Sequence, residues 1–449
     1  MERRAFLSYS AAAAGAAPKS AALVNRLESA FTKLEIVDTH EHLLPEAERT
    51  AQPVDFFTLA GHYALNDVIS AGLGKDDAAR VRDPKTPLAE RWRLFEPHWK
   101  SARFTGYGQC LRIAMRDIYE VEELSAGTIA RLNEAIGAKN KPGLYEDVLK
   151  RRARIAYAVL DQSFGAKAVR PDPRYFVVAA RFDRFVTARG RSGIRSLEEL
   201  TGESIATLAD LKRALEKDFQ RAKPLGMIAV KSALAYQREL FFDDVPQAEA
   251  EREFEAMMRG ERPSPSGFQS ALHRPYRKLE DHLFHHIIRL AAEHRLAVQI
   301  HTGLLAGNSG YTPNTNPSHL TNLFALYPQV TFDLFHIGYP YQSEMAVLAK
   351  LYPNVCIDFC WAHIVAPHAA QRALDEFLET VPANKILGFG GDYRFAELTY
   401  AHAAMARRNI AETLAARVER GTIREDDAAE LGRMFLYDNP ARLFPHPAA

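Results

Sequence analysis

Eight short apolar runs have the character of buried strands, and their order along the chain constrains the fold more than any other feature. They occupy residues 34–40, 155–160, 175–180, 227–231, 297–301, 330–336, 355–359 and 386–392. From the fourth run onward, helix-like segments such as 281–294 and 367–381 separate them. Short strands that alternate with helices form parallel βαβ units. Eight such units predict an α/β protein with a closed (β/α)8 barrel, the TIM-barrel fold.

One uneven spacing suggests how the domain is organised. More than a hundred residues separate the first two strand-like runs. Residues of about 55–150 in this interval are rich in helix formers and aromatic side chains, which predicts a helical insertion that covers the mouth of the barrel. A barrel with insertions can exceed about 400 residues, so a chain of 449 residues is predicted to hold one barrel over residues 34–444.

The first 20 residues have the pattern of a targeting segment. Paired Arg3 and Arg4 precede Phe6 and Leu7, an alanine-rich stretch follows, and Pro18 ends it. This order resembles a twin-arginine export signal, which predicts a periplasmic or exported protein. The alternative is the alanine-rich start of a helix in a cytoplasmic protein.

Composition excludes several classes of protein. Lys and Arg together number 57 and Asp and Glu 56, so the basic face that a nucleic-acid binder needs is not expected. No apolar run approaches the roughly 20 residues of a membrane span. Three cysteines cannot build a disulfide framework, and Cys356 and Cys360 are interpreted as small core residues. The expected partner is a small-molecule substrate, and a homo-oligomer is left open.

Polar residues at the ends of four strand-like runs carry the chemistry. His40 and His42 end the first run, two residues apart, and therefore share a face. His301 ends the fifth run, His336 ends the sixth, and Asp392 ends the eighth. The carboxyl ends of barrel strands meet at one rim, where imidazoles and a carboxylate can bind one metal. Any single histidine could be a core or surface residue, but the set indicates a metal site.

These residues resemble the amidohydrolase superfamily, in which a His-x-His pair, two further histidines and an aspartate end the same strands. The resemblance is carried by residues 230–236, 299–303, 316–320, 336–340 and 348–353. It is nearer to the amidohydrolase-like domain that is fused to glutamine synthetase in nodulin-like proteins. The sequence also resembles uronate isomerase, more distantly. That family likewise has a helical insertion and an Asp-x-Arg motif like Asp392-Tyr393-Arg394. The chain ends soon after Phe444, so functions that need the fused domain are not expected.

The resemblance implies a divalent metal and suggests roles for its ligands. Zn²⁺ is the expected ion, with Mn²⁺ or Fe²⁺ as alternatives. His40, His42 and Asp392 would hold it, with His301 as a further ligand. Such a metal lowers the pKa of a bound water to about 7. Asp392 is placed to take the proton of that water. His336 is either a ligand or a neutral group that polarises the substrate carbonyl, and the second role is favoured.

Further residues are candidates for catalysis or substrate binding. Lys231 ends the fourth run and has three interpretations: a carboxylated lysine that bridges two metals, a cation that contacts the substrate, or a side chain that reaches the rim. Tyr236, Arg238 and Arg394 follow strand ends and could bind an anionic group, and Trp361 could wall the pocket.

The sequence therefore favours a metal-dependent hydrolase that activates a metal-bound water to cleave a C–N bond, of the amide type, in a small polar substrate. Two alternatives remain open. One is an isomerase or lyase that acts on a sugar acid or an aromatic acid, and the other is a non-catalytic relative. Fold alone does not separate them, because one barrel hosts many chemistries.

Overall fold

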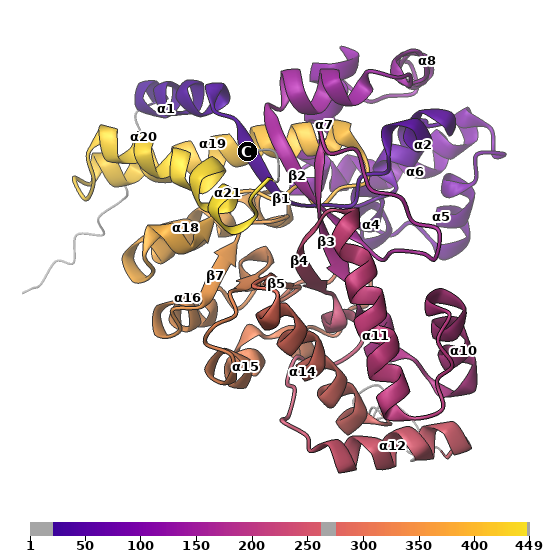
Figure 1. Cartoon of the computed structure of the whole chain (residues 1–449). Coiled ribbons are helices and arrows are strands. Elements are labelled where there is room, and N and C mark those ends of the chain that lie inside the picture. The colour runs from indigo at the N-terminus through magenta and orange to yellow at the C-terminus, as the bar shows by residue number, and fades with distance from the viewer. Residues whose placement is uncertain (1–20, 262–274, 447–449) are drawn as a thin grey trace, which may run out of the picture.

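The computed structural model describes residues 21–261 and 275–446, and its centre is a barrel of eight parallel strands (Figure 1). The strands are β1 (Ile36–Glu41), β2 (Ile155–Gln162), β3 (Phe176–Arg181), β4 (Met227–Ser232), β5 (Ala297–Ile300), β6 (Phe332–Leu334), β7 (Val355–Asp358) and β8 (Ile386–Leu387). Each strand pairs in parallel with the next one along the chain. The predicted TIM-barrel fold is confirmed, whereas the predicted export signal lies outside the described residues.

Backbone hydrogen bonds beyond the short strand β8 close the barrel against β1. The amide of Thr39 donates to Phe389 O (3.1 Å), the amide of Asp392 to His40 O (2.8 Å), and the amide of His42 to Tyr393 O (3.0 Å). The segments that carry the histidine pair and the aspartate are therefore bonded directly to each other.

Alternation along the strands separates two layers of apolar packing. Val177 and Ala179 of β3 join a cluster inside the barrel with Val37 and Ala229. Their neighbour Val178 belongs to the larger cluster between the strands and the helices. Because successive strand residues point to opposite faces, both faces of the strands must be apolar, and this explains the continuous apolar runs of the sequence.

Two groups of helices surround the strands. Between β1 and β2 lie α2 (Glu46–Ala51), α3 (Phe56–Ala60), α4 (Ala64–Ser70), α5 (Lys75–Arg82), α6 (Leu88–Ala102), α7 (Gly106–Tyr119), α8 (Ile129–Lys139) and a π-helical segment (Glu146–Arg152). The others are α1 (Ala21–Lys33), α9 (Asp183–Thr187), α10 (Gly190–Thr201), α11 (Leu208–Ala222), α12 (Gln247–Arg259), α14 (Arg277–Glu293), α15 (Thr321–Leu326), α16 (Gln342–Leu351), α17 (Ala362–Val365), α18 (Pro367–Thr380), α19 (Ala396–Glu419), α20 (Glu425–Arg433) and α21 (Asn439–Leu443).

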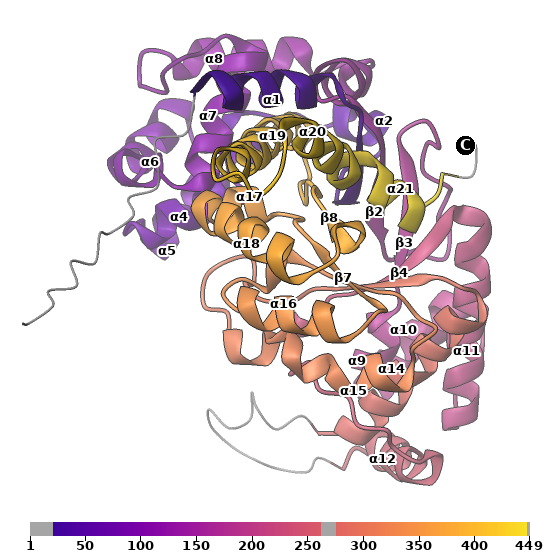
Figure 2. The same cartoon turned by 90° about the vertical axis from the view of Figure 1, so that its left-hand side faces the viewer.

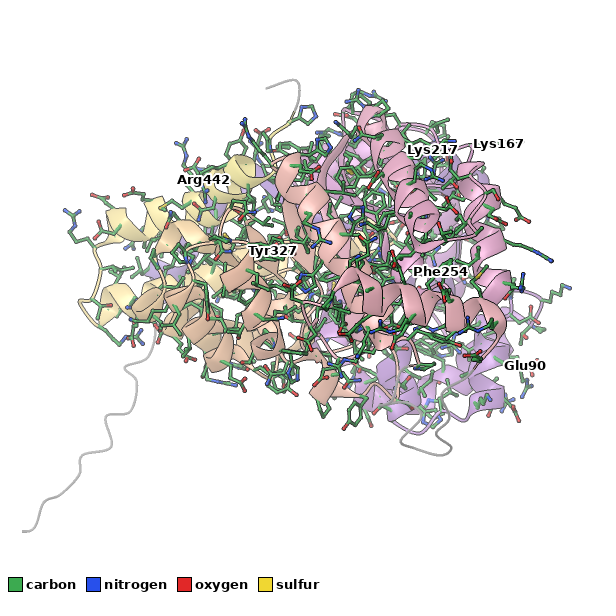
Figure 3. The ribbon with its side chains drawn as sticks, turned by 60° about the horizontal axis from the view of Figure 1, so that its bottom comes forward. Glu90, Lys167, Lys217, Phe254, Tyr327 and Arg442 are labelled. Carbon is green, nitrogen blue, oxygen red and sulfur yellow. The ribbon has the colours of Figure 1, made fainter. Side chains whose placement is uncertain are left out.

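The helices between β1 and β2 gather on one side of the barrel (Figures 1 and 2). The first helix, α1, instead packs against α19, which lies near the C-terminus. Charged side chains are exposed at the outer edge, among them Lys217 of α11 and Lys167 between β2 and β3 (Figure 3). Tyr327, in contrast, is buried among the helices. Within the described ranges, no helix combines the length and the apolar character that crossing a membrane requires.

A buried ion pair fastens the inserted helices to the barrel. The guanidinium of Arg49 on α2 donates to Glu397 Oε1 on α19 (2.7 Å), and the hydroxyl of Tyr119 on α7 donates to the same oxygen (2.8 Å). Both partners of the ion pair are at most 1% exposed. Water cannot replace either partner at this depth, so the pair fixes α2 and α7 relative to α19.

We expect Glu397→Ala to lower the free energy of unfolding by about 3–5 kcal/mol, because it leaves the Arg49 charge buried without a partner. The measurement is urea denaturation followed by circular dichroism. The control is Glu425→Ala, which breaks the exposed Arg26–Glu425 pair (2.9 Å) and should lower the free energy of unfolding much less, because solvent screens exposed charges. Equal losses in the two variants would contradict the structural role of the buried pair.

Candidate metal centre

A pocket of about 440 Å³ opens where the strands end. Residues from several strand ends and from the insertion line it: His40, His42, His62, Tyr63, Arg181, Asp183, Arg184, Thr187, Lys231, Ala233, Tyr236, Gln237, His301, Ala306 and Asp392. Active sites of TIM barrels lie at this carboxyl-terminal face. The structure therefore brings the strand-end residues together at the position where ligands bind in this fold.

Asp392 lies between the histidines of β1 and the imidazole of His336. Its Oδ1 lies 3.0 Å from His42 Nε2 and 3.7 Å from His40 Nε2, and its Oδ2 lies 3.9 Å from His336 Nε2. The two longer gaps exceed hydrogen-bond length. They are within the roughly 4 Å that two coordination bonds of about 2 Å can span, so this set suits a divalent cation.

Asp161, at the end of β2, completes the group on the β1 side. Its Oδ2 lies 3.8 Å from both His40 Nε2 and His42 Nδ1. Ligand atoms of Asp161, His40 and His42 all lie within 4.8 Å of one another. Arg181, at the end of β3, forms an ion pair with this carboxylate and holds it in place.

The hydrogen bonds of two further histidines leave a position for a cation. His336 Nδ1 lies 2.9 Å from Cys360 O, and His301 Nε2 lies 2.9 Å from Leu304 O. Carbonyl oxygens only accept, so both of these ring nitrogens must be donors. In neutral rings this leaves lone pairs on His336 Nε2 and His301 Nδ1, which are 2.9 Å apart. A cation that binds both would remove the repulsion between them.

Burial keeps the imidazoles neutral and therefore able to bind metal. It lowers the pKa of His336 to about 4 and the pKa of His40 and His301 well below the ordinary value. For Asp392, burial favours the neutral acid, but the hydrogen bond from His42 and the nearby rings of His40 and His336 outweigh it. The pKa of Asp392 therefore lies well below its usual range, and Asp392 is a carboxylate at neutral pH.

The backbone around Asp392 is adapted to this position. Asp392 has φ 58°, in the left-handed region that aspartate and asparagine tolerate better than most residues. A Cβ at Gly391 would lie 1.9 Å from Glu41 Oε1, and one at Gly390 would lie 2.5 Å from Thr39 Oγ1. Only glycine lets the chain after β8 approach β1 this closely.

Lys231 lines the pocket from inside the barrel and does not extend to the outer rim. It is 2% exposed, and its Nζ lies 3.5 Å from the centroid of the Phe335 ring. Burial lowers its pKa, and the nearby Asp161 opposes this effect. The placement suits a cation that contacts a substrate, and the carboxylated form stays a prediction.

Tyr236 is placed in the pocket, but three other residues predicted to contact substrate are not. Arg238 is buried in ion pairs with Glu280 and Asp281 on α14, so its charge is already neutralised. Arg394 is exposed to solvent and does not line the pocket. Trp361 is 1% exposed and stacks behind Tyr63, with ring centroids 4.9 Å apart. The substrate contacts predicted for these three residues do not fit their placement.

Several residues in or beside the pocket were not predicted, among them Asp161, Arg181, His62 and Tyr63. Asp161 and Arg181 directly follow the second and third strand-like runs, so the strand-end rule that selected the histidines would also have found them. His62 and Tyr63 come from the turn between α3 and α4, inside the insertion. No periodic pattern marks them, because their position depends on how the insertion folds over the barrel.

His363, close to Trp361, lies outside the pocket and makes stability depend on pH. Its Nε2 bonds Gly388 O (3.0 Å), and burial lowers its pKa to about 4. The unfolded chain, with a pKa of about 6.5, binds a proton that the folded chain excludes. The contribution of His363 to the free energy of unfolding should therefore fall by roughly 3 kcal/mol as the pH drops from about 6.5 to about 4. His363→Gln should flatten that slope in metal-free protein, and the exposed His368→Gln should not. An unchanged slope in His363→Gln would refute the assignment.

A family model described as Amidohydrolase matches residues 229–446. This part of the chain is therefore similar to the amidohydrolase family. The matched stretch contains Lys231, His301 and Asp392, which line the pocket, and His336, whose Nε2 lies 3.9 Å from Asp392 Oδ2 behind it. The histidine pair of β1 lies outside it and is joined to it by the bonds that close the barrel.

Two kinds of curated relative match different extents of the chain. Protein fluG of Emericella nidulans is 32% identical over 148 residues, 33% of this chain and only 17% of that protein. Uronate isomerase of Nostoc punctiforme is 23% identical over 463 aligned positions that cover 94% of both chains. The resemblance to the domain fused to glutamine synthetase, which the sequence favoured, is therefore supported by a partial match only. The resemblance to uronate isomerase is supported by a match over nearly the full length of both chains.

Solved structures share the fold. Uronate isomerase from Thermotoga maritima superposes with a TM-score of 0.77 at 17% identity, over 94% of this chain and 97% of that one. Glucuronate isomerase from Caulobacter crescentus gives 0.76 at 19% identity, over 95% and 94%. The likeness extends beyond the barrel to nearly the whole chain.

Proposed function

We propose that this chain is a metal-dependent isomerase that interconverts the aldose and ketose forms of a uronate. The observation that carries the proposal is the alignment with uronate isomerase, which spans 94% of both chains and therefore includes the insertion. The pocket agrees with such a substrate, because it combines carboxylates, imidazoles and the cations of Arg181 and Lys231. Cleavage of a C–N bond, the activity favoured from the sequence, has only the superfamily match in its support.

The residues divide into those that bind the substrate and those that transfer a proton. A uronate carries a carboxylate at one end and a carbonyl beside a hydroxyl at the other. Lys231 supplies positive charge for the carboxylate, whereas the charge of Arg181 is paired with Asp161. A cation held by His40, His42 and Asp392 would supply a Lewis acid for the carbonyl and the hydroxyl.

Isomerisation moves one hydrogen between neighbouring carbons. A carboxylate takes the proton from C2 of the aldose, and the electron pair of that C–H bond forms the C1–C2 double bond of an enediolate. Delivery of the proton to C1, with transfer of the O2 proton to O1, completes the ketose. Asp392 has a pKa well below its usual range, so it is an unprotonated carboxylate at neutral pH and can accept the proton.

The test is a substrate panel with protein reconstituted with Zn²⁺, Mn²⁺ or Fe²⁺. Glucuronate and galacturonate should each give the corresponding ketose, detected by proton NMR. A reaction in D₂O should place deuterium at C1 of the product, because the shuttled proton exchanges on the base. The same preparation should leave γ-glutamyl amides and N-acyl amino acids intact. Release of amine from an amide, with no change in either uronate, would replace the isomerase by the hydrolase.

A further inference from the structure

Asp392 joins two groups of ligand atoms. Its Oδ1 faces His40 and His42, to which Asp161 is adjacent, and its Oδ2 faces His336. The second group contains an atom type that the first lacks, because ligand atoms of His336, Cys360 and Asp392 all lie within 4.8 Å of one another. The thiol of Cys360 was expected to be inert packing, yet it lies beside two groups that bind metals.

The fold holds Cys360 in this place by backbone contacts on both sides. Its amide donates to Asp358 Oδ1 (2.7 Å), and its carbonyl accepts from His336 Nδ1 (2.9 Å). A Cβ at Gly390 would lie 2.8 Å from Cys360 Cβ and 3.0 Å from its Sγ, so the absent side chain at position 390 leaves room for the thiol. The residue is 0% exposed.

The other two cysteines differ from Cys360. Cys110 Sγ donates to Leu398 O (3.5 Å) and contacts the hydroxyl of Tyr393 (3.4 Å), so its polar atom is used in packing. Cys356 belongs to the apolar cluster inside the barrel, away from the pocket. Cys360, in contrast, is fully buried beside a carboxylate and an imidazole.

A second observation also points to a cation beside Cys360. The hydrogen bonds of His336 and His301 turn two lone pairs toward each other at 2.9 Å, and one of them belongs to the same His336 Nε2 that faces Asp392 Oδ2. These buried lone pairs need an electrophile between or near them. A thiol is the weak donor of the set, and it becomes a strong ligand once a metal displaces its proton.

We propose that Cys360 is a metal ligand, and that its thiolate, His336 Nε2 and Asp392 Oδ2 hold a second divalent cation beside the one bound by the histidine pair. Bonds of about 2.3 Å to sulfur and about 2.0–2.1 Å to nitrogen place these two atoms about 3.5 Å apart. A movement of about 1 Å closes the observed group to that size. The set of one sulfur, one nitrogen and one oxygen selects Zn²⁺ or Co²⁺ over Mg²⁺, which prefers oxygen ligands.

This proposal rests on the metal centre of the proposed isomerase, but its test does not depend on catalysis. The probe is Co²⁺, which is added to the metal-free full-length protein and followed by absorption spectroscopy. A thiolate bound to cobalt gives a charge-transfer band in the near ultraviolet that nitrogen and oxygen ligands do not give. The band should appear with the second equivalent of Co²⁺, and elemental analysis should find two ions per chain.

Cys360→Ser keeps the size of the side chain and removes sulfur. It should abolish the band and reduce binding to one ion per chain, whereas the matched Cys356→Ser and Cys110→Ser variants should keep both the band and the second ion. Should Cys360→Ser fail to fold, X-ray absorption at the cobalt edge of the unaltered protein is the alternative readout, because a bound thiolate adds a Co–S distance of about 2.3 Å.

The outcomes separate this proposal from the proposed function. A cobalt–thiolate band in a protein that isomerises no uronate supports the ligand and rejects the substrate. Isomerase activity without the band, or a band that survives in Cys360→Ser, overturns the ligand and leaves the function standing. A cobalt-edge spectrum without a Co–S distance also overturns the ligand.

Discussion

Asp392→Asn should lower kcat by about 10²–10⁴-fold, the usual range for loss of a general acid–base group. Asparagine has nearly the shape of aspartate and tolerates the left-handed backbone at φ 58°, so the chain after β8 keeps its path. It can still offer a carbonyl oxygen to a metal. It cannot accept a proton at neutral pH, which is the property that the low pKa of Asp392 provides.

The decisive quantity is turnover per bound metal, because the substitution also weakens metal binding. His40 and His42 remain in place, so we expect part of the metal to stay bound and the KM to change less than kcat. Both proteins are compared at the metal content found by elemental analysis, with glucuronate as substrate. Turnover within a few-fold of the unaltered protein at equal metal would show that another group transfers the proton, and Asp161 would then be the next candidate.

The barrel could be predicted because its signal is local. Each strand must be apolar on both faces, as Val177 and Val178 illustrate by packing inside and outside the barrel, and such runs are visible without any partner. The histidines and Asp392 could be predicted for the same reason, because polar residues that end the buried strands of a barrel lie at its rim.

The sequence does not show the tertiary partners of a side chain, so it could not predict which residues those partners would place in the pocket. Arg238 follows a strand end like Arg181, but α14 offers it two carboxylates, and nothing near Arg238 in the sequence shows this. Trp361 lies behind Tyr63 because the insertion fills the space that the indole was expected to line. Cys360 sits in an apolar run and differs from Cys356 only through the segments that β6 and β8 bring beside it.

The histidine pair gives the second large expected effect. His40→Ala combined with His42→Ala should remove the ion that this pair holds and reduce uronate isomerisation to the level of the solvent reaction. These two rings supply the ligand atoms nearest Asp392 Oδ1, at 3.7 and 3.0 Å, and no other imidazole approaches that oxygen within the described residues. Loss of these ligands should weaken metal binding strongly, because Asp392 would have no imidazole beside its Oδ1 to share the cation.

The control for the pair is His319→Ala with His368→Ala, which removes two imidazoles outside the pocket. Its metal content and activity should match those of the unaltered protein. In the His40 and His42 variant, restored activity at high Zn²⁺ would indicate weakened binding, and its absence would indicate a lost site; both agree with a ligand role. An undiminished metal content in this variant would show that His40 and His42 are not metal ligands. A retained single ion with a cobalt–thiolate band would be informative in another way, because it would place the surviving metal on the Cys360 side of Asp392 and show that the two groups bind independently.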